Sequence, residues 1–204
     1  MISVKKNAPI DSFIDFVHHE KPKVWEDLHK QTKFPNLYSQ IKSALVKEQG
    51  GVSAYTEEPI SPKSHIDHFY KRSLFSKLTF DWKNLFVDGL SEHYGAKYKD
   101  SVVSKKCDYD SLISPNENNV ERYFTYMENG EIIVASGLSK QEAQRADYTI
   151  KTFNLNDSEL KSRRAKVIKN VRDFGEGLAP NDIRSALTDF GFRTVIEYAL
   201  ILTS

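Results

Sequence analysis

The chain has 204 residues, of which 39% are apolar and 28% charged, and its formal net charge is +1. This length suits one full-size domain or two small ones with a shared core, and the charge excludes a chain that is basic throughout. Cys107 is the single cysteine, which excludes both a disulfide framework within the chain and a zinc site made of several cysteines.

The start of the chain carries no predicted targeting signal. The opening residues, MISVKKNAPIDSF, lack the apolar core of a signal peptide. No run of residues approaches the roughly 18 apolar residues that a membrane-spanning helix needs. We therefore expect a cytoplasmic protein.

Residues 1–50 form the first predicted segment, which is mainly helical. Apolar residues at helical spacing predict a helix over Asp11–His19, with Asp11 as its N-cap. Pro22 separates this helix from a second helical stretch, and Asn36 begins a third that ends at a Gly-Gly pair. For the three histidines of this segment we expect ordinary surface or core roles, because nothing nearby completes a ligand set: His18, His19 and His29.

Residues 51–106 form a second segment of different character. SHIDHF (64–69) alternates as a strand, FDWKNLF (80–86) is aromatic and expected to be buried, and a short helix is expected after Asp88 and Gly89. From position 61 to 106 there are nine Lys or Arg and five Asp or Glu residues, a local excess of +4. This segment could therefore bind phosphate although the whole chain is nearly neutral.

Residues 107–204 form the third segment, and we expect the three segments to pack as one unit. A β-hairpin is predicted within 121–136, with Asn129 and Gly130 at its turn. Ser139 and Glu142 have the spacing of a capping box and predict the start of a helix. A further helix is expected over 156–174, another from Pro180, and an apolar stretch over 194–204 that packs into the core or on a partner. On the helix 156–174 we expect a solvated basic face formed by Arg163, Arg164 and Lys166.

The second segment also contains an ordered set of polar side chains. Asp67 directly precedes His68, Asn84 follows 16 residues after His68, and His93 lies nine residues beyond Asn84. This order and spacing is that of a ββα-metal nuclease site, the HNH motif. Cleavage of a phosphodiester requires a nucleophile, a base to deprotonate it and a cation to stabilise the developing charge, and these residue types can supply or hold all three.

Each member of the set has an expected role. We assign His68 as general base, Asn84 as the residue that orients it, and Asp67 and His93 as ligands of a single Mg²⁺ or Mn²⁺ ion. His65 could assist Asp67, since the two share one strand face, or it could simply form a hydrogen bond. The candidates for binding the nucleic-acid backbone are Lys71, Arg72, Lys83, Lys97 and Lys99, although Lys97 and Lys99 could equally be a solvated pair.

Two stretches around these residues, HIDHF and FDWKNLF, carry a resemblance to the HNH nuclease family. The layout from about 36 to 172, including RYFTY…GEI and TIKTFNLNDSELKSRR, resembles the HNH subunit (PtuB) of Septu-type anti-phage systems and of the retrons that use it. The resemblance covers roughly two thirds of the chain. It implies a metal-dependent nuclease that works with an ABC-type ATPase subunit (PtuA) and, in retrons, with a reverse transcriptase and its RNA/DNA.

The sequence departs from that family where many HNH nucleases carry two C-x-x-C pairs. The corresponding positions are Ser53, Thr56, Gly89 and Glu92, so no structural Zn²⁺ is expected. Packing must hold the hairpin instead, and the candidate residues are Tyr55, Trp82 and Phe86. The expected fold is therefore α+β: mainly helical, with an embedded ββα-metal hairpin that lacks the zinc cysteines.

Two functions remain open at this point. The first is an active nuclease, with DNA as the first candidate substrate and a cellular RNA such as tRNA as the second. The second is a non-catalytic ββα module that binds nucleic acid for the same kind of complex. An acid beside a base favours the nuclease, because a binding module has no need of that pair.

Overall fold

The computed structural model describes residues 1–175 and 177–203 and has an α+β fold. Its α-helices are α1 (Asp11–Glu20), α2 (Asp27–Lys30), α3 (Leu37–Glu48), α4 (Ala96–Val102), α5 (Lys140–Thr152), α6 (Ser158–Gly175), α7 (Pro180–Leu187) and α8 (Arg193–Thr203). Its strands are β1 (His65–His68), β2 (Leu85–Asp88), β3 (Phe124–Tyr126) and β4 (Ile132–Val134). Short 3₁₀ helices are η1 (Ser76–Leu78), η2 (Trp82–Asn84), η3 (Lys106–Ser111), η4 (Val120–Tyr123) and η5 (Thr188–Phe190).

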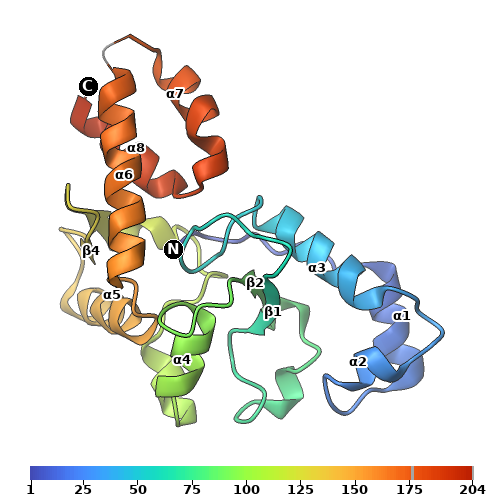
Figure 1. The fold of residues 1–204 in the computed structure, drawn as a ribbon. Helices are drawn as coiled ribbons and strands as arrows, with labels where there is room; N and C mark the ends of the chain where they lie inside the picture. Colours follow the sequence, from blue (N-terminus) through green and yellow to red (C-terminus); the bar gives the residue numbers. More distant parts are fainter. Residues whose placement is uncertain (176, 204) are drawn as a thin grey trace.

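The strands form two separate antiparallel hairpins. In the first, β1 pairs with β2 so that Asp67 lies opposite Phe86 and His68 opposite Leu85. In Figure 1 this hairpin lies centrally, with α1–α3 on one side, α4 below it and the later helices on the other side. The order β1, β2, α4 therefore places two strands and a helix around the predicted site residues.

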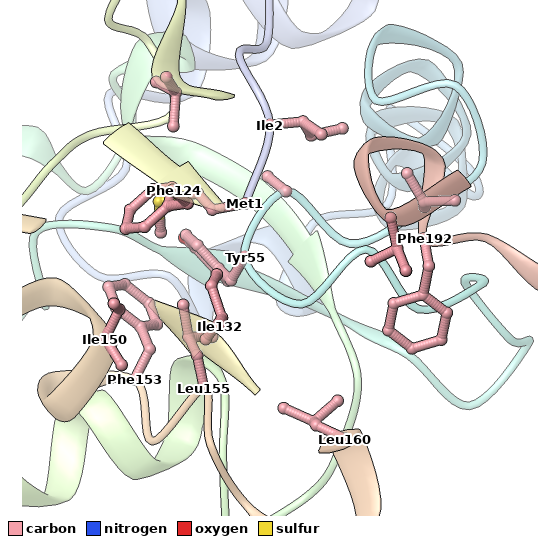
Figure 2. Close-up of a cluster of buried hydrophobic side chains, with 14 of the residues drawn as sticks. Met1, Ile2, Tyr55, Phe124, Ile132, Ile150, Phe153, Leu155, Leu160 and Phe192 are labelled. Atoms are coloured by element: carbon pink, nitrogen blue, oxygen red, sulfur yellow. The ribbon is translucent and has the colours of Figure 1, made fainter. Parts of the chain in front are cut away.

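Two groups of buried apolar side chains stabilise this arrangement. The N-terminal core joins α1, α2 and α3 to one face of the first hairpin, through side chains such as Phe16, Ile41 and Leu85. The main core gathers residues from distant parts of the chain, and Figure 2 shows several of them together, including Met1, Tyr55, Phe124, Phe153 and Phe192. The segment 51–106 contributes to both cores, so the hairpin lies between them.

Several local predictions are confirmed. The second hairpin, β3–β4, turns through Asn129 and Gly130, and Gly130 has the positive φ of 80° that such a turn favours. The capping box is present, with Ser139 and Glu142 each accepting a backbone N–H of the other. Tyr55, Trp82 and Phe86 are all buried, as expected of residues that hold the hairpin by packing.

Two local predictions are wrong. Asp11 is the first residue of α1 and not its N-cap, because the extended residue before the helix is Ile10. Arg164 does not belong to a solvated face: it is 2% exposed and donates hydrogen bonds to the carbonyls of Gly130 and Leu155. Tertiary packing brings those carbonyls to the helix, so the guanidinium replaces water as their partner.

The C-terminal apolar stretch forms α8, which packs against α6 and β3. Ser204, the last residue of that predicted stretch, lies outside the described residues. Within residues 1–175 and 177–203, no helix is both long and apolar enough to cross a membrane.

Candidate active site

Asn84 is the last residue of the long connection (69–84) between β1 and β2. Its side-chain oxygen accepts the Tyr70 N–H at 2.7 Å, and its amide donates to the carbonyls of Tyr70 and Leu78 at 3.1 Å each. One side chain at the end of the connection thereby binds the backbone near its start, at Tyr70, and in its middle, at Leu78. We predicted that Asn84 orients the His68 ring. Its hydrogen bonds hold the loop that carries Thr79, the partner of that ring, so any orienting effect is indirect.

The imidazole of His68 has a defined tautomer. Nε2 lies 2.9 Å from the carbonyl oxygen of Thr79, and because a carbonyl can only accept, Nε2 must carry the proton. In a neutral ring this leaves the lone pair on Nδ1, to which the described residues offer no hydrogen bond. Thr79 is itself fixed, since its hydroxyl donates to the Ser76 carbonyl at 2.8 Å.

The surroundings of His68 keep the ring neutral. Its side chain is only 6% exposed, and the edge-to-face contact with Trp25 has a centroid distance of 4.7 Å. Burial lowers the pKa of His68 from 6.5 to about 4, although the Thr79 hydrogen bond and the Asp67 charge act in the opposite direction. A neutral imidazole with a free Nδ1 can accept a proton from water.

Asp67 precedes His68 on β1, and one of its two carboxylate oxygens binds neighbouring side chains. Oδ2 accepts the Tyr55 hydroxyl at 2.6 Å and lies 3.4 Å from the Lys99 ammonium. Burial acts to raise the pKa of this carboxyl, but the Lys99 charge and the Tyr55 hydrogen bond outweigh it and hold the pKa below its usual range. The carboxylate is therefore ionised, with Oδ1 free of hydrogen bonds within the described part of the chain.

Lys99 on α4 is the least expected member of the site. It is fully buried, and it donates to the backbone carbonyls of His68 at 3.0 Å and Phe69 at 2.8 Å. A second carboxylate, Asp100, lies 3.1 Å from the same ammonium. Lys99 therefore fits neither of its predicted roles, phosphate contact or solvated pair with Lys97, since it is 0% exposed.

Hydrogen bonds connect the 53–56 turn to β2 and to α4. The Ser53 hydroxyl donates to Asp88 Oδ1 at 2.5 Å and accepts the N–H groups of Tyr55 and Thr56 at 3.1 Å. Asp88 Oδ2 accepts the N–H of Ala96, the first residue of α4, at 2.7 Å. One buried carboxylate thus joins the 53–56 turn to the start of α4.

Gly95 makes this connection possible. It has a φ of 77°, and a Cβ at this position would lie 2.5 Å from Asp88 Oδ2. A larger residue would push the carboxylate away from the helix start. Burial raises the pKa of Asp88, even though its hydrogen bonds to Ala96 and Ser53 act to lower it.

The predicted metal ligands are only partly brought together. His65 lies two residues from Asp67 on β1, and its Nδ1 is buried without a hydrogen-bond partner. His93 is exposed, and its carbonyl accepts a hydrogen bond from Asn154 Nδ2 at 2.7 Å. Among the described residues, no hydrogen bond or ion pair joins the His93 ring to Asp67, and no group of three or more His, Cys, Asp or Glu side chains suited to a metal occurs.

The remaining basic residues differ in their availability. The Lys71 ammonium donates to the carbonyls of Asp100 and Val103 at the end of α4, so a phosphate would have to displace these carbonyls to make the predicted contact. Arg72 forms an exposed ion pair with Glu26 at 2.9 Å, and Lys97 pairs with Glu92 at 2.5 Å. Lys83 is exposed, without an ion pair among the described residues.

No protein-family model matches the sequence, and no curated protein matches it. The chemistry of the site therefore follows from its own side chains. Sequence reasoning missed the Thr79 carbonyl, the contact with Trp25 and the hydrogen bond from Tyr55, because a backbone acceptor or a distant aromatic ring has no signature near His68 in the chain.

Proposed function

We propose that this chain is a metal-dependent HNH endonuclease in which β1, β2 and α4 form the ββα-metal unit. One observation carries the proposal: His68 ends β1 as a neutral imidazole whose Nε2 is bound to the Thr79 carbonyl and whose Nδ1 is free. An ionised carboxylate, Asp67, precedes it on the same strand. A base and an acid held in this way suit hydrolysis of a phosphodiester.

The reaction begins with deprotonation of water by His68. Nδ1 takes a proton from a water molecule, and the resulting hydroxide attacks phosphorus as the bond to the leaving oxygen breaks. The imidazolium that forms is stabilised by the neighbouring Asp67 charge. The low pKa makes His68 a weaker base than free histidine, but it keeps the ring unprotonated throughout the neutral range.

The residues around Asp67 fit a divalent ion that keeps most of its water. Oδ1 of Asp67 is free, and the buried Nδ1 of His65, two residues away, lacks a partner. Mg²⁺ is commonly bound through one or two carboxylates together with waters and substrate phosphate, so Asp67 with help from His65 would suffice. A bound Mg²⁺ or Mn²⁺ ion would supply positive charge to the phosphate and the leaving oxygen.

Other residues support the reaction without touching substrate. Lys99 fixes the backbone at His68 and Phe69, and Asn84 fixes the loop that carries Thr79. The hydrogen bonds from Ser53 through Asp88 to α4 replace the zinc-bound cysteines of many HNH nucleases. We therefore propose a site that needs a catalytic metal and no structural Zn²⁺.

The second candidate function is a non-catalytic module that binds nucleic acid. The observation that favours it is the Lys99 ammonium, which already lies beside Asp67, while His93 lies at the surface. The arrangement of His68 favours the nuclease more strongly, because a binding module gains nothing from a neutral imidazole with one nitrogen fixed and the other free.

The biological setting that we propose rests on the family resemblance. It makes the chain the effector of a bacterial anti-phage complex with an ABC-type ATPase subunit (PtuA), in the cytoplasm. Retron-borne complexes would add a reverse transcriptase with its RNA/DNA. The substrate would be DNA, with tRNA or another RNA as the second candidate. Both carry the backbone phosphate, which is the part of the substrate that the proposed site residues would contact.

The test is cleavage of plasmid DNA and of tRNA by the wild-type chain, alone and with its ATPase partner. We expect cleavage with Mg²⁺ or Mn²⁺ and none with EDTA. His68→Ala should lower the rate by about 10²–10⁴-fold, the usual cost of removing a general base. His18→Ala, a control at an exposed histidine of α1, should change it little. A His68→Ala rate within threefold of wild type would show that the assignment is wrong.

A further inference from the structure

Trp25 lies outside the proposed ββα unit but contacts its base. It belongs to the turn between α1 and α2, 43 positions before His68 in the chain. The two rings meet edge to face, with centroids 4.7 Å apart and an interplanar angle of 89°. Trp25 is 7% exposed, so the contact lies inside the protein. The N-terminal helical segment thus contributes a side chain that packs on His68.

Two contacts connect the turn that carries Trp25 to the loop that follows His68. Trp25 stacks on Phe80 with centroids 5.6 Å apart, and Phe80 directly follows Thr79, the residue whose carbonyl holds Nε2. On the surface, Glu26 forms its ion pair with Arg72 at 2.9 Å. Both contacts join residues 25–26 to the connection between β1 and β2.

His68 is consequently restrained in two different ways. The hydrogen bond to Thr79 fixes one ring nitrogen, but a ring held by one hydrogen bond can still tilt about that bond. The indole of Trp25 meets the imidazole at right angles and blocks such a tilt. Since general-base catalysis depends on where the lone pair points, a small error in ring orientation lowers the rate strongly.

We propose that Trp25 is a positioning residue for His68, so that the N-terminal helical segment is part of the active site. This inference rests on the proposed nuclease function. Trp25 acts through His68 and touches neither substrate nor metal in this role. Its contribution should therefore appear in kcat and leave KM nearly unchanged.

The competing explanation is that Trp25 is only part of the N-terminal core. The chain offers a matched control, because its other tryptophan, Trp82, is 4% exposed and lies in the same core. Trp82 packs on Phe13 with centroids 5.3 Å apart and donates to Glu48 at 2.9 Å. Among the interactions of the described residues, it has no ring contact with His68.

The experiment compares Trp25→Ala, Trp25→Phe and Trp82→Phe in the full chain. Steady-state cleavage gives kcat and KM, and the ring protons of His68, assigned by NMR through loss of their signals in His68→Gln, report the contact directly. We expect Trp25→Ala to lower kcat by about tenfold or more with KM within threefold, as for a misplaced catalytic group. Its His68 ring protons should lose the shift that the indole ring current causes.

The conservative changes separate positioning from packing. Trp25→Phe keeps an aromatic ring against His68, so it should restore kcat to within about threefold and retain a ring-current shift. Trp82→Phe should leave the His68 ring signals and kcat unchanged even where it lowers the melting temperature. Unchanged His68 signals in Trp25→Ala, or an equal loss of kcat in Trp82→Phe, would overturn the inference.

Failure of the function and failure of the inference give different results. If wild type and His68→Ala cleave equally, the proposed nuclease site is wrong. If His68→Ala is inactive but Trp25→Ala keeps its kcat, only the role of Trp25 is wrong. If wild type does not cleave at all, the NMR comparison still decides, since ring signals of His68 that do not respond to Trp25 would refute positioning.

Discussion

Single residues in this protein take their chemical state from burial and one or two close partners. His68 loses most of its solvent exposure to Trp25 and the neighbouring loop, and it stays neutral. Asp67 is buried to a similar degree but stays ionised, because the Lys99 ammonium lies 3.4 Å away. Burial favours the neutral form of both groups, but the cation beside Asp67 outweighs it there, so these neighbours on one strand differ in charge.

The state of His68 predicts how stability depends on pH. Its pKa is about 4 in the folded protein and 6.5 when unfolded. Between these values the unfolded chain binds the proton more readily, so the free energy of unfolding falls as pH falls from 6.5 towards 4. The loss attributable to His68 at pH 4.5 should be roughly 2–3 kcal/mol.

Urea unfolding of wild type and His68→Gln at pH 7 and pH 4.5 measures this contribution. Glutamine keeps an amide that can donate to the Thr79 carbonyl but does not titrate. The wild type should lose more free energy of unfolding between the two pH values than the variant. Equal losses would mean that His68 is not buried as a neutral ring.

At the scale of elements, hydrogen bonds connect α4 to the first hairpin and its loop at both ends of the helix and in the middle of the helix. Asp88 binds the N–H of Ala96 at the start, Lys71 binds the carbonyls of Asp100 and Val103 at the end, and Lys99 reaches the backbone at His68 between them. Several of these contacts involve a charged group, and such hydrogen bonds are the stronger kind. These contacts therefore fix the position of the helix relative to β1.

Asp88→Ala tests the connection between the hairpin and the start of α4. The substitution leaves the buried Ser53 hydroxyl and the Ala96 N–H without their partner, which should cost about 1–3 kcal/mol of unfolding free energy. Cleavage should fall as well, measured at a temperature where the variant is fully folded, because α4 carries Lys99. Asp88→Asn keeps an acceptor for one of the two donors and should lose less than Asp88→Ala on both measurements. If Asp88→Ala and Asp88→Asn had the same free energy of unfolding, the hydrogen bonds of Asp88 would not be what connects α4 to the 53–56 turn.

At the scale of the whole molecule, the proposed site lies where the N-terminal helical segment, the hairpin and α4 meet. The N-terminal core packs on one face of the hairpin, and the main core contains Tyr55, which binds Asp67. Among the predicted phosphate contacts, the structure leaves Arg72, Lys83 and Lys97 at least partly accessible and uses Lys71 and Lys99 internally. Of these three, Arg72 follows His68 most closely in the chain, so the nucleic acid should approach along Arg72.

Arg72→Ala tests this approach. Its ion pair with Glu26 is exposed on both sides, so a phosphate can displace the carboxylate at little cost. Loss of one phosphate contact should reduce the slope of log affinity against log salt concentration by about 0.9 for duplex DNA. Fluorescence anisotropy with labelled DNA over a range of salt concentrations measures the slope.

Two further variants serve as controls for that measurement. Glu26→Gln frees Arg72 and should keep or strengthen binding. Lys71→Ala should lower stability but leave the salt slope as in wild type, since its ammonium binds the end of α4. A change of slope in Lys71→Ala without one in Arg72→Ala would place the nucleic acid elsewhere.

The sequence by itself determined the elements whose signals are local. The alternation in SHIDHF predicted β1, the Asn-Gly pair predicted the β3–β4 turn, and Ser139 with Glu142 predicted the start of α5. These patterns depend on a few neighbouring residues and on backbone geometry, which a short stretch of sequence contains in full. That Asp67 and His68 are neighbours is likewise visible in a short stretch of the sequence.

Only the tertiary structure decided how the polar side chains are used. Lys99, Lys71 and Arg164 look like surface cations in the sequence, but each binds backbone carbonyls that the fold brings to it from elsewhere in the chain. The Thr79 carbonyl that fixes His68 is equally invisible, because every residue has a carbonyl. A long flexible cation can reach water or a buried acceptor, and the choice depends on which acceptors packing has removed from water.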